Sequence, residues 1–219
     1  MVDSKTFWDR MAPKYAESPM RSAEDYEHTL AITQSHLAPE MRVLELGCGT
    51  GTTALRLAPL VGQYLGTDQS GEMVRIAREK AAEAGLSNLS FLALSAQEST
   101  QESSQESSRR DARFDVVMGF NLFHLTPDPE GLMRDIFAML APGGLMISKT
   151  PCLADPAFGW KRFLVRAVLP VLKRIGKAPE VGLWRMSDVD RLIAGAGFET
   201  VEAGNWPAIS RYVVARKPD

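Results

Sequence analysis

Short apolar runs alternate with longer amphipathic stretches along most of the chain. Five of these runs predict buried strands, at residues 43–46, 64–67, 89–94, 115–119 and 145–148. Helical periodicity is expected between them, at 52–58, 71–84 and 130–140. This alternation is typical of βαβ units, whose parallel strands form a sheet that helices cover on both faces. The pattern therefore predicts an α/β fold with a doubly wound sheet.

The two ends of the chain depart from this alternation. Helical patterns at 6–15 and 21–37 precede the first strand, and a long insertion follows residue 151. A helix is expected at 187–196, and two short alternating runs at 198–202 and 210–215 fit a hairpin at one sheet edge. We divide a single domain into a helical cap (1–38), a core (39–150), an insertion (151–186), and a final helix with hairpin (187–219).

Residues 97–108 are three near-copies of a Gln-Glu-Ser-Ser tetrapeptide. No apolar residue occurs between 97 and 110, so we expect this stretch to bury no face and to form a solvated loop or a frayed helix. A phosphorylated regulatory segment is the alternative interpretation.

Composition narrows the class of protein. The 219 residues are 45% apolar and 24% charged, which fits a soluble globular chain. Cys48 and Cys152 lack the spacing of a zinc site, so we expect no metal and a reducing compartment. Charges near the N-terminus and the absence of a long apolar run favour a cytoplasmic protein. The net charge of −2, without a dense basic run, argues against a nucleic-acid partner.

The run from Val43 to Gly51 is the strongest local motif. Gly47, Gly49 and Gly51 follow a predicted strand and precede a predicted helix, where glycine lets the backbone turn sharply and approach a ligand closely. The third glycine comes one residue too early for the usual diphosphate fingerprint. The carboxylate of Glu45 suits a ligand with a cationic amine. The alternative is an ordinary tight turn.

A second acidic residue follows the next predicted strand. Asp68 lies 17 residues after Gly51, about where a carboxylate accepts hydrogen bonds from the ribose hydroxyls of a bound nucleoside. Alternatively, Asp68 caps the helix that begins near Ser70. The two roles are compatible.

Four motifs together resemble the class I S-adenosylmethionine-dependent methyltransferases, in particular those of quinone biosynthesis. They are Glu45-Leu-Gly-Cys-Gly-Thr-Gly51, Asp68-Gln-Ser70, Phe114-Asp-Val-Val117 and Leu140-Ala-Pro-Gly-Gly144. The resemblance spans about residues 6–148. It implies a Rossmann-like sheet of seven strands in the order 3-2-1-4-5-7-6, with the last strand antiparallel. It also implies S-adenosylmethionine as methyl donor and S-adenosylhomocysteine as product.

The resemblance assigns candidate residues to each part of this cofactor. Those expected to bind it are Tyr15, Glu45, Gly47, Cys48, Gly49, Gly51, Asp68, Gln69, Met73, Ser95, Ala96, Gln97 and Phe120. The loop of residues 45–51 would surround the methionine part, Asp68 would hold the ribose, and Gln69 and Met73 would line the adenine. Many relatives have Gly-Asp-Ala where this chain has Leu94-Ser95-Ala96. Ser95 is a weaker, neutral acceptor for the adenine amino group, and Gln97 is a second candidate.

Two further residues have competing interpretations. Tyr15 is a candidate to close over the cofactor sulfonium, but Phe7, Trp8, Met11 and Tyr15 also form a helical stripe that would pack on the sheet. His124 follows the fourth predicted strand and is the candidate base for an acceptor hydroxyl. Its alternative is a packed histidine with no proton role, because methyl transfer depends mainly on alignment.

The insertion is strongly basic. Residues 158–185 carry seven Lys or Arg against the single acid Glu180, a net charge of +6. Eight apolar residues of this stretch fall on one side of a helical wheel, although Pro170 should kink or end the helix. They are Trp160, Phe163, Leu164, Ala167, Val168, Val171, Leu172 and Ile175. Three interpretations remain: a lid over an apolar acceptor pocket, a membrane-surface contact through 158–177, and a homodimer interface.

The sequence therefore predicts a methyltransferase that acts on a small, apolar or aromatic acceptor by in-line displacement. The first alternative is a nicotinamide-dependent oxidoreductase on a related sheet, which the glycine spacing disfavours. The second is a methyltransferase-like binding module without turnover.

Overall fold

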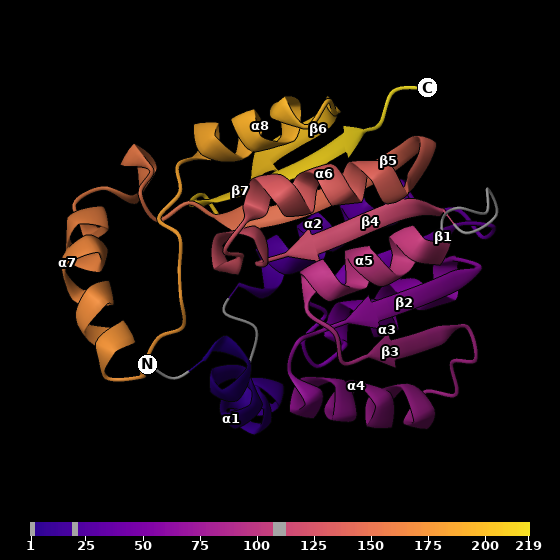
Figure 1. The fold of residues 1–219 in the computed structure, drawn as a ribbon, viewed down its shortest axis with the longest axis horizontal. Coiled ribbons are helices and arrows are strands. Elements are labelled where there is room, and N and C mark those ends of the chain that lie inside the picture. The colour runs from indigo at the N-terminus through magenta and orange to yellow at the C-terminus, as the bar shows by residue number, and fades with distance from the viewer. Residues whose placement is uncertain (1–2, 19–21, 107–112) are drawn as a thin grey trace.

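A seven-stranded sheet forms the centre of the molecule (Figure 1). The computed structural model describes residues 3–18, 22–106 and 113–219. The strand order is β3-β2-β1-β4-β5-β7-β6, and β7 runs antiparallel to both of its neighbours. The strands are β1 (Arg42–Leu46), β2 (Gln63–Thr67), β3 (Leu89–Leu92), β4 (Phe114–Phe120), β5 (Leu140–Pro151), β6 (Glu199–Asn205) and β7 (Ser210–Arg216). This confirms the predicted order and the reversed last strand.

Helices cover the sheet on both faces, and two more lie at the end where the parallel strands finish. One core joins the sheet to α2, α3 and α4, and the other joins it to α6 and α8. The helices are α1 (Ser4–Glu17), α2 (Ala23–Ser35), α3 (Thr52–Leu57), α4 (Gly71–Glu83), α5 (Ala96–Glu106), α6 (Pro129–Met139), α7 (Lys161–Arg174) and α8 (Met186–Gly195). Within the described ranges the short 3-10 turns are η1 (Ala58–Leu60), η3 (Phe123–Leu125) and η4 (Pro156–Phe158).

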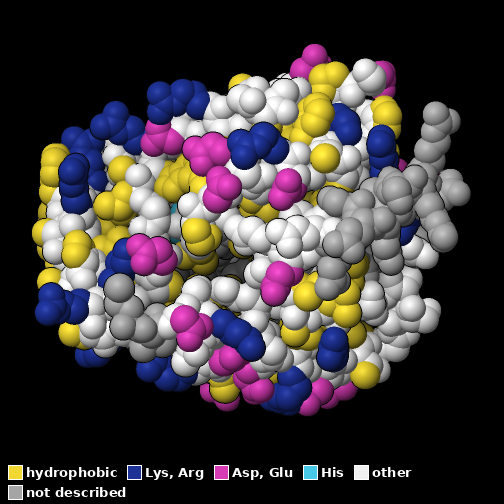
Figure 2. Space-filling model, viewed as in Figure 1, with side chains coloured by type: hydrophobic (Ala, Val, Ile, Leu, Met, Phe, Trp, Pro, Cys, Tyr) yellow, Lys and Arg dark blue, Asp and Glu magenta, His cyan; other side chains and the backbone are white. Residues whose placement is uncertain are grey.

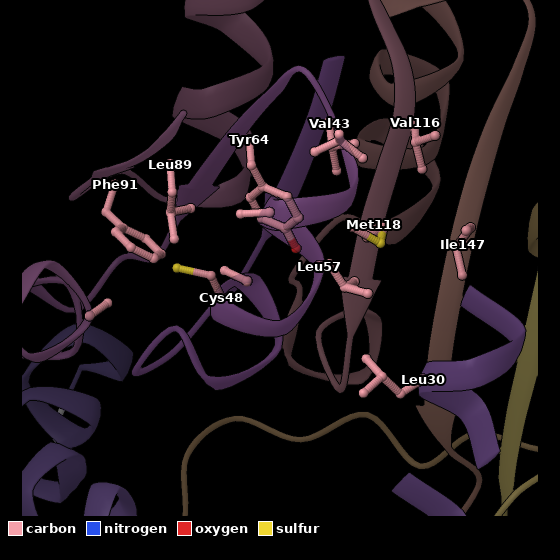
Figure 3. Packing of buried hydrophobic residues seen from close by; sticks show 14 of the residues in the cluster. Leu30, Val43, Cys48, Leu57, Tyr64, Leu89, Phe91, Val116, Met118 and Ile147 are labelled. Atoms are coloured by element: carbon pink, nitrogen blue, oxygen red, sulfur yellow. The ribbon is translucent and has the colours of Figure 1, made fainter. Parts of the chain in front are cut away.

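Strand register explains why the central strands are apolar throughout. Val43 is paired with Tyr64 on one side and Val116 on the other, so all three side chains enter the same core (Figure 3). Leu44 and Leu46 alternate to the opposite core. A parallel sheet with helices on both faces has no solvent side, which is why these strands lack polar alternation.

Most expected elements are confirmed, with ends shifted by a few residues. The helix that was predicted to kink or end just before Pro170 does not end there, because it continues to Arg174 as α7. Pro170 lacks the N–H that would bond to the carbonyl of Arg166, so the helix loses one internal hydrogen bond there. The expected end at Pro170 was therefore wrong.

The first part of the Gln-Glu-Ser-Ser repeats is a helix with a buried face, contrary to the expected solvated stretch. Ser99 and Thr100 in α5 are almost fully buried, and α5 packs against α6. Their hydroxyls donate to the carbonyls of Ser95 (2.7 Å) and Gln97 (2.9 Å), and Thr100 also bonds Asp135 of α6. Small polar side chains can be buried when their hydroxyls form hydrogen bonds to the backbone of the same helix. Residues 107–110 of the predicted solvated stretch lie outside the described residues.

We expect Gly51→Ala to destabilise the fold more than Gly85→Ala. Both glycines have positive φ, at 73° and 66°. A Cβ on Gly51 would lie 2.9 Å from Phe91 and 3.0 Å from Ala77, whereas a Cβ on Gly85 would meet nothing within 4 Å. The strain of a left-handed alanine alone costs about 1–2 kcal/mol, and overpacking adds about 1–3 kcal/mol. Equal losses in urea unfolding would contradict this packing.

Candidate active site

The loop after β1 is shaped by glycines in the left-handed region. Gly47, Gly49 and Gly51 have φ angles of 69°, 55° and 73°. The N–H of Cys48 donates to the carbonyl of Thr67 (2.9 Å), which fixes the loop to the end of β2. A Cβ at Gly49 would meet only the ring of Tyr15, at 3.8 Å. The backbone of Gly49 is therefore open toward the space beneath Tyr15.

Asp68 holds this loop to the start of α4. Its Oδ2 accepts from the N–H of Gly49 and its Oδ1 from the N–H of Ser70, both at 2.9 Å. Burial raises the pKa of the carboxyl, while both backbone bonds lower it. The cap of α4 is Ser70, whose hydroxyl accepts from Met73, rather than Asp68. Each Asp68 oxygen keeps a second lone pair for a ligand hydroxyl.

Glu45 lies deeper, in β1, with only 3% of its surface exposed. The hydroxyl of Tyr64 donates to its Oε2 at 2.9 Å. Burial raises the pKa of Glu45 to about 8, and the nearby Asp68 carboxylate adds to the rise, although the Tyr64 bond lowers it. In the absence of a cationic ligand, the Glu45 carboxyl is therefore mostly protonated at neutral pH.

The N-terminal helix α1 covers this loop. Asp9 accepts from the Ser70 hydroxyl (2.6 Å) and from the N–H of Glu72 (3.3 Å). Gln69 donates to the hydroxyl of Ser4 at 2.8 Å. On the same helix, the rings of Trp8 and Tyr15 meet edge to face. Burial and the negative charges of Asp68 and Glu45 raise the pKa of Tyr15.

These elements enclose a cleft of about 260 Å³. Ten of the residues expected to bind cofactor line it: Tyr15, Gly47, Gly49, Asp68, Gln69, Met73, Ser95, Ala96, Gln97 and Phe120. The prediction missed eight others: Ser4, Trp8, Asn121, Leu122, Leu125, Thr126, Pro127 and Glu180. Asn121 and Leu122 directly follow β4, so the end of that strand was a usable signal for the crevice. Glu180 carried no such signal, because the insertion alone brings it there.

Glu45, Cys48 and Gly51 lie behind the lining of the cleft. The Cys48 side chain belongs to the core beside Phe91 and Tyr64, and burial raises its pKa (Figure 3). Gly51 precedes the first turn of α3. In this structure Cys48 and Gly51 shape the loop from within.

Ser95 is part of a helix cap. Its hydroxyl accepts from the N–H of Glu98 (3.2 Å), and the Glu98 carboxylate accepts from the N–H of Ser95 (2.8 Å). This reciprocal pair is the Ser-x-x-Glu capping box, which is visible in the sequence and marks the start of α5. The Ser95 hydroxyl therefore meets a ligand only as a donor or through its remaining lone pair.

His124 lies in η3, between cleft-lining neighbours, but its own ring is not part of the lining. Burial lowers its pKa to about 4, and its buried Nδ1 has no hydrogen-bond partner among the described residues. Its carbonyl accepts from the N–H of Gly182 (2.6 Å), which ties η3 to the insertion. The imidazole is therefore neutral at physiological pH.

The described residues hold few other places for chemistry. Within them, no three His, Cys, Asp or Glu side chains gather into a group that could hold a metal ion. No helix among them combines the length and apolar content needed to cross a bilayer. A hollow of about 560 Å³ between α6 and α8 is rimmed by Glu130, Arg134, Asp188 and Arg191, and it contains none of the predicted site residues.

The cleft fits a nucleoside with a cationic, amino-acid-like tail. The backbone at Gly49 has room for close approach, and Asp68 has free lone pairs for a pair of hydroxyls. Aromatic rings from Trp8 and Tyr15 and the buried Glu45 carboxyl provide partners for positive charge.

Comparison with known proteins identifies the protein family to which this chain belongs. A family model described as "Methyltransferase domain" matches residues 37–176. The Ubiquinone biosynthesis O-methyltransferase of Albidiferax ferrireducens is 30% identical over 118 residues, which are 53% of this chain and 44% of that protein. The chain spans 42–59% of the length of the curated relatives of that name.

Solved structures share the fold at lower identity. The [4+2]-cyclase SpnF has a TM-score of 0.69 at 18% identity, with 98% of this chain and 94% of that one covered. Magnesium protoporphyrin IX methyltransferase from Synechocystis PCC 6803, solved with bound S-adenosylhomocysteine, has a TM-score of 0.65 at 16% identity, with 97% and 94% covered. The family match over more than half of the chain, together with the motifs and sheet order, shows that this chain belongs to the class I S-adenosylmethionine-dependent methyltransferases.

Proposed function

We propose that this protein transfers a methyl group from S-adenosylmethionine to a small, apolar or aromatic acceptor. The observation that carries the proposal is the hydrogen bond between Gly49 and Asp68, which joins the glycine loop and the acidic strand end in one cleft wall. Membership of the methyltransferase family supports the same reading.

Each part of the cofactor has a candidate partner. When bound, S-adenosylmethionine supplies an activated methyl group on a sulfonium. The Asp68 carboxylate accepts from the ribose hydroxyls, and the Tyr15 ring faces the positive charge. Glu45 stabilises the amine from behind the glycine loop. Met73, Ala96 and Gln97 line the part of the cleft that we assign to adenine.

The remaining cleft wall favours an apolar acceptor. Phe120, Leu122, Leu125 and Trp8 contribute aromatic or aliphatic surface, and Asn121 and Thr126 contribute polar atoms. The names of the ubiquinone-biosynthesis relatives are consistent with an acceptor of this kind. The wall can align an acceptor oxygen, nitrogen or carbon with the methyl group. This alignment is the source of most of the rate enhancement.

For a hydroxyl acceptor, the new bond joins the methyl carbon to the acceptor oxygen as the bond to sulfur breaks. The hydroxyl proton must then leave, and we assign it to His124, whose neutral imidazole can accept it. Its neighbours Leu122 and Leu125 line the cleft, whereas His124 itself does not, so this role requires the ring to reach the acceptor when it is bound.

A methyltransferase-like binding module without turnover is the alternative to this activity. Calorimetry should show S-adenosylhomocysteine binding in either case. Turnover with a panel of phenols, hydroquinones and amines then tests catalysis. Cofactor binding with no product from any acceptor class would favour a binding module.

Asp68→Ala should weaken the binding of S-adenosylhomocysteine by about 1–3 kcal/mol, a roughly 5- to 150-fold rise in Kd. The ribose hydroxyls lose a charged acceptor, and the loop loses its bond to Gly49. Calorimetry measures the affinity. Asp190→Asn is the matched control, because Asp190 pairs with Arg211 outside the cleft. Unchanged affinity in Asp68→Ala would remove this residue from the site.

Cofactor binding should release a proton from Glu45. Its pKa of about 8 leaves it protonated near pH 7, and a bound ammonium group favours the carboxylate. Affinity should therefore increase as pH rises from about 6 toward 8, by at most about tenfold per pH unit. Calorimetry in buffers of different ionisation enthalpy counts the released proton. Glu45→Gln should abolish the release, and an unchanged release would assign it to another group.

His124→Asn should lower kcat by about 10² to 10⁴ if the acceptor is a hydroxyl. Burial lowers the pKa of His124 to about 4, so the imidazole is protonated only near that pH. The wild-type kcat should therefore decrease only as pH falls through about 4. His36→Asn, a change in a histidine that pairs with Glu202, is the control. A kcat that is unchanged in His124→Asn would leave this residue a packing role only.

A further inference from the structure

Helix α7 presents its most apolar side to solvent. Six large apolar side chains between Trp160 and Ile175 are 39–69% exposed. They are Trp160, Phe163, Leu164, Val168, Val171 and Ile175. In the described part of the chain only four other large apolar side chains are exposed, by 38–51%. Six of the ten exposed large apolar side chains in the described residues therefore belong to α7 or directly flank it.

The opposite side of α7 faces the protein. Val165, Leu169 and Leu172 are only partly exposed, and so are Arg162 and Lys173. On a helical wheel Leu169, Arg162 and Lys173 lie opposite the exposed apolar face, and Val165 and Leu172 lie between the two sides. The side of α7 with more large apolar residues therefore faces solvent, and the side with fewer faces the protein. The helix lies apart from the sheet (Figure 1).

Positive charge surrounds the exposed apolar face. Lys161 and Arg174 flank it on the wheel, and both are exposed. The guanidinium of Arg162 lies 4.7 Å from the centre of the Phe163 ring. Figure 2 shows hydrophobic and basic side chains interleaved over this end of the molecule. Of the seven cations in residues 158–185, Lys173 alone has an acidic ion-pair partner among the described residues, Glu180.

We propose that α7 docks on an anionic lipid surface. A second copy of this chain fits poorly, because a two-fold contact would bring two segments of charge +6 together. A lid that packs over its own cleft would turn the apolar face inward, and the structure has it outward. An anionic bilayer satisfies both features, since it takes apolar side chains and attracts the flanking cations.

The geometry of α7 suits binding along a surface. Its 14 residues span about 21 Å, which is shorter than the hydrocarbon core of about 30 Å. The helix can lie in the interface with its apolar side chains inserted and its cations at the headgroups.

Contacts connect α7 to the cleft. Glu180 lines the cleft and pairs with Lys173 of α7. Arg10 of the α1 cap donates to the carbonyl of Gly176, just beyond α7, at 2.8 Å. A surface held by α7 therefore lies close to the cleft rim. This placement, which rests on the proposed function, would let an apolar acceptor enter from the bilayer.

Vesicle co-sedimentation tests the proposal. The wild-type protein should bind vesicles of equimolar phosphatidylcholine and phosphatidylglycerol, with at least about tenfold weaker binding to phosphatidylcholine alone and a decrease at high salt. The double variant Phe163→Ser, Val171→Ser should bind the mixed vesicles at least about tenfold more weakly. Leu60→Ser is the matched control, because Leu60 is an exposed apolar residue of η1 and should leave binding unchanged.

Light scattering and calorimetry separate the other outcomes. The variant should bind S-adenosylhomocysteine like the wild type, so that lost vesicle binding cannot reflect a damaged cofactor site. Absence of vesicle binding by the wild type would overturn the membrane proposal and leave the proposed function intact. A wild-type dimer that becomes monomeric in the double variant would instead identify α7 as a subunit interface and overturn it as well.

Discussion

The hydrogen bond from the N–H of Gly49 to Asp68 is the interaction on which the site depends. It joins the ends of two neighbouring parallel strands, β1 and β2, across a loop that only left-handed glycines can form. Asp68 also accepts a hydrogen bond from the N–H of Ser70, the residue that caps α4, and so fixes the first turn of that helix. Through Ser70 and Asp9 it also fixes the position of α1. One carboxylate thus organises three walls of the cleft.

That arrangement places two acidic groups, Glu45 and Asp68, in a buried region, and both have raised pKa values. Burying carboxyl groups opposes stability, and the Tyr64 hydroxyl and backbone amides offset only part of the cost. A polar residue inside an apolar core is the kind of local conflict that occurs at functional sites. A cationic ligand is the natural partner that removes the conflict.

Sequence patterns predicted the strands well, because β1 and β4 are buried on both faces and need continuous apolar runs. The burial of Ser99 and Thr100 was not predictable from periodicity, since it depends on contact with α6. A helical wheel separates the two sides of α7 but does not say which side faces solvent. The contact of Tyr64 with Glu45 follows from strand register, and the approach of Glu180 to the cleft follows from tertiary structure alone. Local patterns therefore determine the elements, while long-range packing determines their exposure.

The N-terminal helix is attached to the rest of the protein at both ends of the cleft. Asp9 and Ser4 contact the start of α4, while Arg10 reaches the insertion near Gly176. Because α1 lies over the part of the cleft that we assign to the nucleoside, we expect release of a bound cofactor to require some of these hydrogen bonds to break. The same opening would precede binding of the next cofactor, so the rate of the catalytic cycle would depend on how readily α1 separates from α4 and the insertion.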